Sequence, residues 1–255
     1  MRIILKENEY AEELIHSKDL GDNPFDNMRI VARYYLDNGY QANDVRDKLD
    51  LFLLQCNPTA SLPKWSELLD RALKKAIKTP AVDIDEIRIS KSEMEKIDSI
   101  KSKQARRLAF TLLCLSKYWM IVLPKSDYWV RDDGNDIMKL ANISTSLKRQ
   151  GLLYRTLKDA GLVQFSRKVD NTNVRVLFAD NDEDTALVIT DFRNLGYQYL
   201  KLKGEPYFEC QNCGITVKYT NPKNNRGQRY CPACAAELAI QHRVNSVMRA
   251  RLSTI

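Results

Sequence analysis

The chain of 255 residues has only two histidines, His16 and His242, and neither stands beside a candidate nucleophile or in metal-ligand spacing. It has no glycine-rich phosphate loop and none of the G-x-S-x-G, H-E-x-x-H or H-x-E patterns of hydrolases, zinc proteases and deaminases. Asp132, Asp133 and Asp136 are of a type that can hold Mg²⁺, but surface carboxylates are common without a metal. We therefore expect a protein that is not an enzyme.

Glycine, proline and long apolar runs are also scarce. Nine glycines and eight prolines are too few for a fibrous or low-complexity chain, and 44% hydrophobic residues give enough apolar surface for a core. The longest apolar run, 108–124, contains Lys117 and is shorter than the about 20 apolar residues of a membrane-spanning helix. The first residues become acidic after three apolar ones, unlike a signal peptide. These features predict a soluble, cytoplasmic protein with no membrane partner.

Positive charge is concentrated near the C-terminus. Residues 210–255 hold seven basic residues and one acid, Glu237, for a net charge of +6, whereas residues 1–209 carry +1. Such a local excess attracts a polyanion, so nucleic acid is the expected partner, with a solvated basic tail as the alternative. The seven basic residues are Lys218, Lys223, Arg226, Arg229, Arg243, Arg249 and Arg251.

Four of the six cysteines have metal-ligand spacing. Seventeen residues separate the pair Cys210 and Cys213 from the pair Cys231 and Cys234. The resulting spacing, C-x2-C-x17-C-x2-C, is typical of a four-thiolate zinc site. Each tight turn presents two sulfurs to one ion, and four thiolates leave no open position, so we expect one structural zinc ion. A disulfide is disfavoured because nothing indicates secretion, and a redox pair because no βαβ pattern surrounds it.

The segment between the cysteine pairs predicts a hairpin. Residues 215–220 alternate as in a strand, 221–227 form a turn-rich loop, and 228–230 return toward the metal. With Gly214 after the first pair, the segment resembles the zinc ribbon family, whose members bind DNA, RNA or protein. Residues 235–252 predict a basic helix with a loose apolar stripe. We favour a phosphate-binding surface, with a protein-docking helix as the rival.

The centre of the chain predicts two helices, a turn, a third helix and a β-hairpin. The expected helices are 102–122, 135–141 and from Ser144 or Thr145 to 160, and the expected strands are 162–168 and 173–178. In the patterns 136–144 and 157–163 this stretch resembles the winged helix-turn-helix family. The third helix region is about two residues longer than usual and contains Gly151, so we expect a kink or an extra preceding turn.

The resemblance implies that the N-terminal part of the third helix enters the major groove of duplex DNA. The implied contacts are Thr145, Ser146, Lys148, Arg149, Gln150 and Arg155 on this helix, and Arg167, Lys168 and Arg175 on the wing. Many winged helices bind proteins without touching DNA, so a protein-docking role stays open.

The predicted fold class is mainly α with small β elements, in three domains. Residues 1–99 form a helical domain with a role in partner binding or homodimerisation, 100–200 a winged helix with a short αβ extension, and 201–255 the zinc ribbon with its basic helix. In the first domain we expect a strand at 2–5 and helices at 9–17, 24–38, 43–56 and 64–78. Cys56 and Cys114 are predicted core thiols.

These patterns indicate a DNA-binding protein, either a transcription regulator or a replication-initiation accessory factor, similar to accessory proteins of phages and mobile elements. The rival hypothesis is an adaptor or inhibitor that docks on a host nucleic-acid machine such as RNA polymerase, a helicase or a nuclease. No residue excludes RNA in place of DNA.

Overall fold

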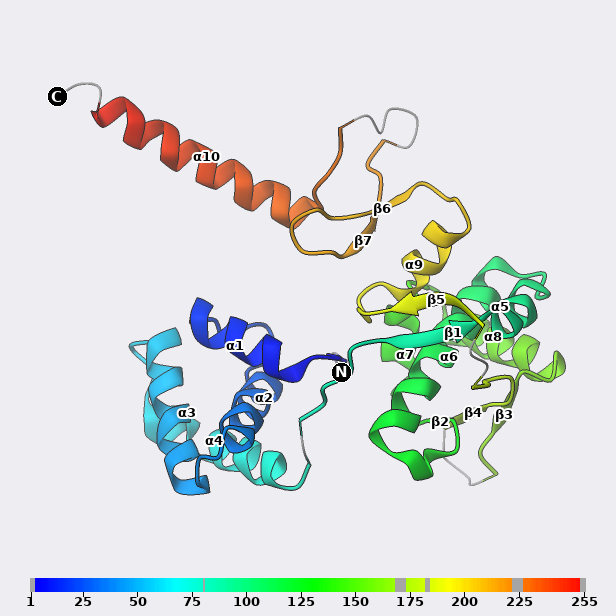
Figure 1. The fold of residues 1–255 in the computed structure, drawn as a ribbon, viewed down its shortest axis with the longest axis horizontal. Coiled ribbons are helices and arrows are strands. Elements are labelled where there is room, and N and C mark those ends of the chain that lie inside the picture. The colour runs from blue at the N-terminus through cyan, green and yellow to red at the C-terminus, as the bar shows by residue number, and fades with distance from the viewer. Residues whose placement is uncertain (1–2, 80, 168–172, 182–183, 222–226, 253–255) are drawn as a thin grey trace. The chain divides into compact units, whose positions relative to one another are not determined.

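The computed structural model describes residues 3–79, 81–167, 173–181, 184–221 and 227–252, with side chains up to Met248 in the last helix. The described chain is mainly helical with small antiparallel sheets, as the sequence predicts (Figure 1). It divides into two compact units, Arg2–Glu86 and Ile87–Ile255. Within the described residues, no helix combines the length and apolar character needed to span a bilayer.

The N-terminal unit consists of the four predicted helices, with bounds that differ by at most two residues. They are α1 (Glu7–Ser17), α2 (Pro24–Asp37), α3 (Ala42–Cys56) and α4 (Leu62–Ile77). Asn23 caps α2 by accepting the Asp26 N–H, and Pro24 takes a first-turn position that needs no N–H donor. The predicted strand at 2–5 is wrong for its described part, since residues 3–5 form no strand and only the next residue, Lys6, makes an isolated bridge with Asp83.

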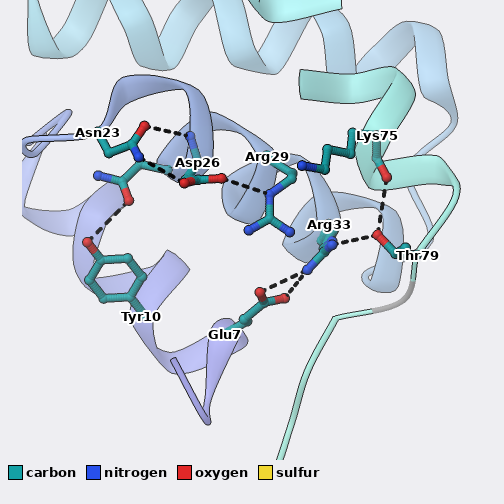
Figure 2. A network of polar contacts seen from close by, with 9 residues as sticks. Glu7, Tyr10, Asn23, Asp26, Arg29, Arg33, Lys75 and Thr79 are labelled. Atoms are coloured by element: carbon teal, nitrogen blue, oxygen red, sulfur yellow. Dashed lines mark hydrogen bonds and ion pairs between the residues drawn. The ribbon is translucent and has the colours of Figure 1, made fainter. Parts of the chain in front are cut away.

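A buried ion pair joins three segments of this unit. Arg33 of α2 donates to Glu7 of α1 at 2.8 Å and also to Thr79 beyond α4, as Figure 2 shows. The second Glu7 oxygen accepts the N–H of Val82 at 3.1 Å. Both charged residues are more than 90% buried. Through these contacts the pair connects α1 and α2 to the segment that follows α4. Removing one partner of such a buried pair lowers the free energy of unfolding by about 3–5 kcal/mol.

The second unit begins earlier than the predicted boundary at residue 99. Strand β1 (Ile87–Ser90) pairs antiparallel with β5 (Thr185–Ile189), and α5 (Lys91–Asp98) follows it directly. Ser90 caps α5 in a reciprocal capping box with Glu93. Neither β1 nor α5 was predicted from the sequence.

Glu93 is fully buried and holds α5 to the rest of the unit. Its carboxylate accepts the N–H groups of Ser90 and Asp180, each at 2.8 Å, and pairs with Lys117 at 2.8 Å. Lys117 lies on α6 (Lys103–Val122), the long helix predicted at 102–122. Cys114 on the same helix is buried as predicted, whereas Cys56 of the first unit is half-buried.

The central elements follow in the order α6, β2, α7, α8, β3, β4. A 3-10 turn at Pro124–Ser126 and the unpredicted strand β2 (Trp129–Val130) precede α7 (Gly134–Leu140). The remaining elements are α8 (Leu147–Asp159), β3 (Val163–Phe165) and β4 (Val174–Val176). The three strands form one antiparallel sheet in the order β2–β4–β3.

Helix α8 begins later than predicted. Its N-cap is Ser146, in extended conformation, not Ser144 or Thr145, and Asn142 in the preceding turn adopts a left-handed conformation. The additional residues therefore lengthen the turn between α7 and α8. The helix itself continues through Gly151.

The C-terminal part contains α9, a two-stranded sheet and a long helix. Helix α9 (Leu195–Leu202) follows a turn in which the Asp191 carboxylate accepts the Arg193 N–H. The predicted domain boundary at 200 falls inside α9. Strands β6 (Tyr207–Glu209) and β7 (Thr216–Lys218) pair antiparallel, and α10 spans Pro232–Leu252.

Candidate metal centre and basic surfaces

The four predicted cysteine ligands lie together. Cys210 follows β6 and Cys213 precedes β7, while Cys231 and Cys234 flank the start of α10. All four sulfurs lie within 4.8 Å of one another, and those of Cys213 and Cys231 are 3.8 Å apart. The cysteines are free thiols, so the disulfide alternative does not apply to this structure. The cluster can hold a metal ion.

The backbone around the cysteines is shaped to present sulfur and to stabilise its charge. The Cys231 N–H donates to the Cys210 sulfur at 3.2 Å, and the Asn212 amide donates to the Cys234 sulfur at 3.4 Å. Gly214 has φ +72 and donates its N–H to the Cys210 carbonyl at 2.9 Å, which closes the first turn. The left-handed conformation explains the glycine that follows the first pair.

The thiols of the cluster differ in acidity. Burial raises the pKa of Cys210, but the N–H groups of Cys213, Cys231 and Asn212 outweigh it and lower the pKa to about 6. Burial raises the pKa of Cys213 to about 12. Bringing four thiolates this close requires a cation, because an opposite charge must offset their repulsion and desolvation.

Two residues that were not predicted from the sequence attach the cluster to the rest of the unit. Arg193 pairs with Asp191 and donates to the Cys213 carbonyl, at 2.7 and 2.6 Å. Asn194 donates to the Thr216 carbonyl of β7 at 3.0 Å. Neither residue stands in a motif, so only the three-dimensional structure could identify them.

Asn194 also connects β7 to the turn before α8. Its side-chain oxygen accepts from the Asn142 amide at 2.9 Å, and the Asn142 oxygen accepts the Tyr197 N–H at 3.1 Å. The Asn142 carbonyl in turn accepts from Arg107 of α6 at 3.0 Å. The turn before α8 is therefore hydrogen-bonded to α6 and α9, and through Asn194 to β7.

The start of α8 carries exposed positive charge. Lys148 and Arg149 lie in its first turn, which has no acidic residue and no side-chain cap from Ser146. In the described part of the chain, neither cation forms an ion pair. Thr145 is half-buried beside them, and its carbonyl accepts from Gln150 at 3.3 Å. Cations are unfavourable at the positive end of a helix dipole, so this end favours an anion.

The other predicted contacts of α8 and the wing are less uniform. Arg155 is exposed and pairs with Asp159 at 3.6 Å. Arg175 is held by Asp127 at 2.6 Å and is only half-exposed. Arg167 is exposed, and Lys168 lies outside the described residues.

The basic residues of the C-terminal part are distributed over the hairpin and α10. Lys218, Arg229 and Arg243 are exposed. Lys223 and Arg226 lie outside the described residues, and only the helical backbone is described for Arg249 and Arg251. The structure thus brings the metal ligands together but leaves the proposed phosphate contacts spread over several elements.

The aspartates between β2 and α7 have structural partners. Asp132 accepts the indole N–H of Trp119 at 2.6 Å, and Asp133 caps α7 by accepting the Asn135 N–H at 2.8 Å. Burial raises the pKa of the Asp132 carboxyl. In the described chain, these residues form no group with the geometry of a metal site.

Comparisons with protein-family models, with curated proteins and with solved structures find no match to this chain. Its function therefore has to follow from its own charges, exposed surfaces and geometry.

Proposed function

We propose that the chain is a DNA-binding protein, a transcription regulator or replication-initiation accessory factor, in which α6 to β4 form a winged helix and residues 205–252 a zinc ribbon. The order α6, β2, α7, α8, β3, β4, with the hairpin strands and β2 in one sheet, fits the winged-helix family. In that family's mode of binding, α8 enters the major groove and the ribbon supplies further phosphate contacts.

The observation that carries the proposal is the first turn of α8. Lys148 and Arg149 are exposed there without an ion pair in the described chain, at a helix end with no acid and no side-chain cap. Both the helix dipole and the two cations favour a phosphate at this end, so DNA would satisfy groups that the protein itself leaves unsatisfied.

The distribution of charge between the two units supports the same assignment. Residues 2–86 contain 12 basic and 16 acidic residues and carry a net charge of −4. Residues 87–255 contain 28 basic and 17 acidic residues and carry +11. A polyanion is therefore expected to bind the second unit, and a role in partner binding or homodimerisation stays our prediction for the first.

For the metal we propose a single structural zinc ion. A tetrahedral site with Zn–S bonds of about 2.3 Å has sulfur–sulfur distances of about 3.8 Å. The distance between the Cys213 and Cys231 sulfurs is 3.8 Å. An all-cysteine ligand set suits zinc, and the ion would supply folding energy to a module with little core of its own.

The test is a fluorescence-anisotropy titration of the zinc-loaded protein with random duplex DNA at about 50 and 200 mM salt. We expect tight binding at low salt that weakens steeply, with single-stranded DNA and RNA run in parallel. The double variant Lys148→Ala/Arg149→Ala should lose about ten-fold in affinity or more, and the slope against log salt should fall by about one for each phosphate that the variant no longer neutralises.

The matched control is Lys74→Ala/Lys78→Ala at the end of α4, which removes the same charge from exposed positions of the acidic unit. It should bind like the unsubstituted protein. Negligible binding of every nucleic acid at low salt would contradict the proposal.

An adaptor that docks on a host nucleic-acid machine is the second candidate function. It is favoured by α10, on which Ile240, Val244, Val247 and Met248 are exposed at helical spacing. Exposed apolar residues of this kind are typical of protein-binding surfaces. This candidate predicts little effect of the Lys148/Arg149 double variant and loss of partner capture on Val244→Ser.

A further inference from the structure

The exposed side of α8 contains a glycine, Gly151, that no contact within the described protein requires. Gly151 is exposed and has ordinary helical backbone geometry, and a Cβ atom there would meet nothing within 4 Å. Glycine in a helix interior destabilises the helix relative to alanine. Neither close packing nor a left-handed conformation within the described protein explains this residue.

Two large apolar side chains lie near Gly151 on the exposed side of α8. Leu147, one turn before it, is 76% exposed, and the adjacent Leu152 is 55% exposed. Lys148 and Arg155 flank them at helical spacing. A single exposed leucine is common on protein surfaces. Two of them beside an unexplained glycine, on a face lined by cations, form a surface with a shallow centre, an apolar flank and a positive rim.

We propose that this surface is a close-approach point for the base edges of duplex DNA, where Leu147 and Leu152 contact the methyl groups of thymines. The inference rests on the proposed function and adds a base preference to it. The major groove is about 12 Å wide, close to the diameter of a helix with its side chains, so a missing side chain lets the backbone move deeper. Thymine alone presents a methyl group there, and leucine can contact it.

Charge complementarity selects DNA as the occupant over a protein. Between Leu147 and Lys158 the exposed charges on α8 are all positive, and the first acidic residue is Asp159 at the end of the helix. A protein partner is the alternative that the test distinguishes.

Gly151→Ala should raise the stability of the protein but lower its affinity for duplex DNA. We expect the urea midpoint to rise, since alanine is the better helix former. Affinity for a random duplex pool should fall at least ten-fold, because the new methyl group holds the helix away from the groove. Gly134→Ala on α7 is the matched control, because its Cβ atom also meets nothing within 4 Å, and its duplex affinity should stay unchanged.

A second experiment tests the thymine contact directly. Duplexes selected from the random pool are resynthesised with deoxyuridine in place of each thymine, which removes only the methyl group. We expect at least one position at which the unsubstituted protein loses three- to ten-fold in affinity. Leu147→Ser/Leu152→Ser should lose this discrimination while keeping its salt-dependent binding of random duplex. Both side chains are exposed, so the variant should fold, and its urea midpoint checks that.

The outcomes separate the two proposals. If salt-dependent duplex binding persists but Gly151→Ala, the deoxyuridine substitutions and the leucine variant change nothing, the close-approach inference is overturned and the proposed function stands. A selection that enriches no sequence overturns the thymine contact. If no duplex binds at low salt, both proposals fail.

Discussion

Gly196 of α9 lies directly against the backbone of Ala141, the residue that ends α7. A Cβ atom at residue 196 would be 1.9 Å from the Ala141 carbonyl oxygen and 2.4 Å from its carbonyl carbon. Gly196 is buried, and its backbone is not left-handed. The glycine is thus required by the close approach of α9 to α7, and this contact positions the turn before α8.

Gly196→Ala should destabilise the second unit by about 1–3 kcal/mol or more, because backbone atoms must move to admit the methyl group. Thermal unfolding followed by tryptophan fluorescence measures it, since Trp119 and Trp129 both lie in this unit. Gly134→Ala meets no atom within 4 Å and should be neutral or stabilising by up to about 1 kcal/mol. Equal melting of the two variants would contradict the packing described.

The metal content of the protein should depend on the four clustered cysteines and not on the cysteines outside the cluster. We expect one zinc ion per chain by elemental analysis, retained in Cys56→Ser and largely lost in Cys213→Ser. Cys56 is half-buried in the first unit, outside the cluster. Acidification should release the ion, because protons compete with it for thiolates. Stoichiometric zinc in Cys213→Ser would refute a four-cysteine site.

Lys117→Met should destabilise the second unit strongly. It leaves the Glu93 carboxylate, which is fully buried, with two N–H donors and no cation. Breaking a buried pair in this way costs about 3–5 kcal/mol. Lys117→Met/Glu93→Gln should recover part of the loss, because the amide removes the buried charge and its single oxygen still accepts one of the two N–H groups. Urea unfolding of the two variants measures the difference, and no recovery would mean that the charge is not the cause.

Asp132→Asn should stabilise the second unit at neutral pH. Burial raises the pKa of the Asp132 carboxyl in the folded state, so the folded protein holds this proton more tightly than the unfolded chain. The contribution of Asp132 to stability is therefore most favourable below the ordinary pKa of about 4 and is lost as pH rises from there through the raised pKa of the folded state. Asparagine removes the charge and keeps an acceptor for Trp119. The gain should therefore appear at pH 7 and shrink toward pH 4.

A matched variant separates charge from hydrogen bonding. Asp132→Ala leaves the Trp119 indole N–H without its partner and should destabilise the unit at every pH. Equal stability of Asp132→Asn and the unsubstituted protein between pH 4 and 7 would mean that burial does not penalise the charge.

Most of the helices and the four metal ligands could be predicted from local patterns in the sequence. The four N-terminal helices have clear apolar periodicity and proline or glycine at their ends, and each cysteine pair is a single local turn. Strand β1 has only four residues and pairs with β5 about a hundred residues later, which no local signal predicts. The boundary at 99 failed to include β1 and α5 in the second unit for the same reason. Arg193 and Asn194 reach the cysteine cluster through tertiary contacts, to the Cys213 and Thr216 carbonyls.

Asn142 and Asn194 both adopt the left-handed conformation, with φ values of 53 and 55. Each side-chain amide both donates and accepts a hydrogen bond: Asn142 donates to Asn194 and accepts from Tyr197, and Asn194 accepts from Asn142 and donates to the Thr216 carbonyl. Glycine would suit the backbone but supply no side-chain bond, and aspartate would tolerate the backbone but lose the donor. Few amino acids other than asparagine meet both demands at either site. During evolution the two positions should therefore be replaced together, as one coupled unit, whenever either is replaced at all.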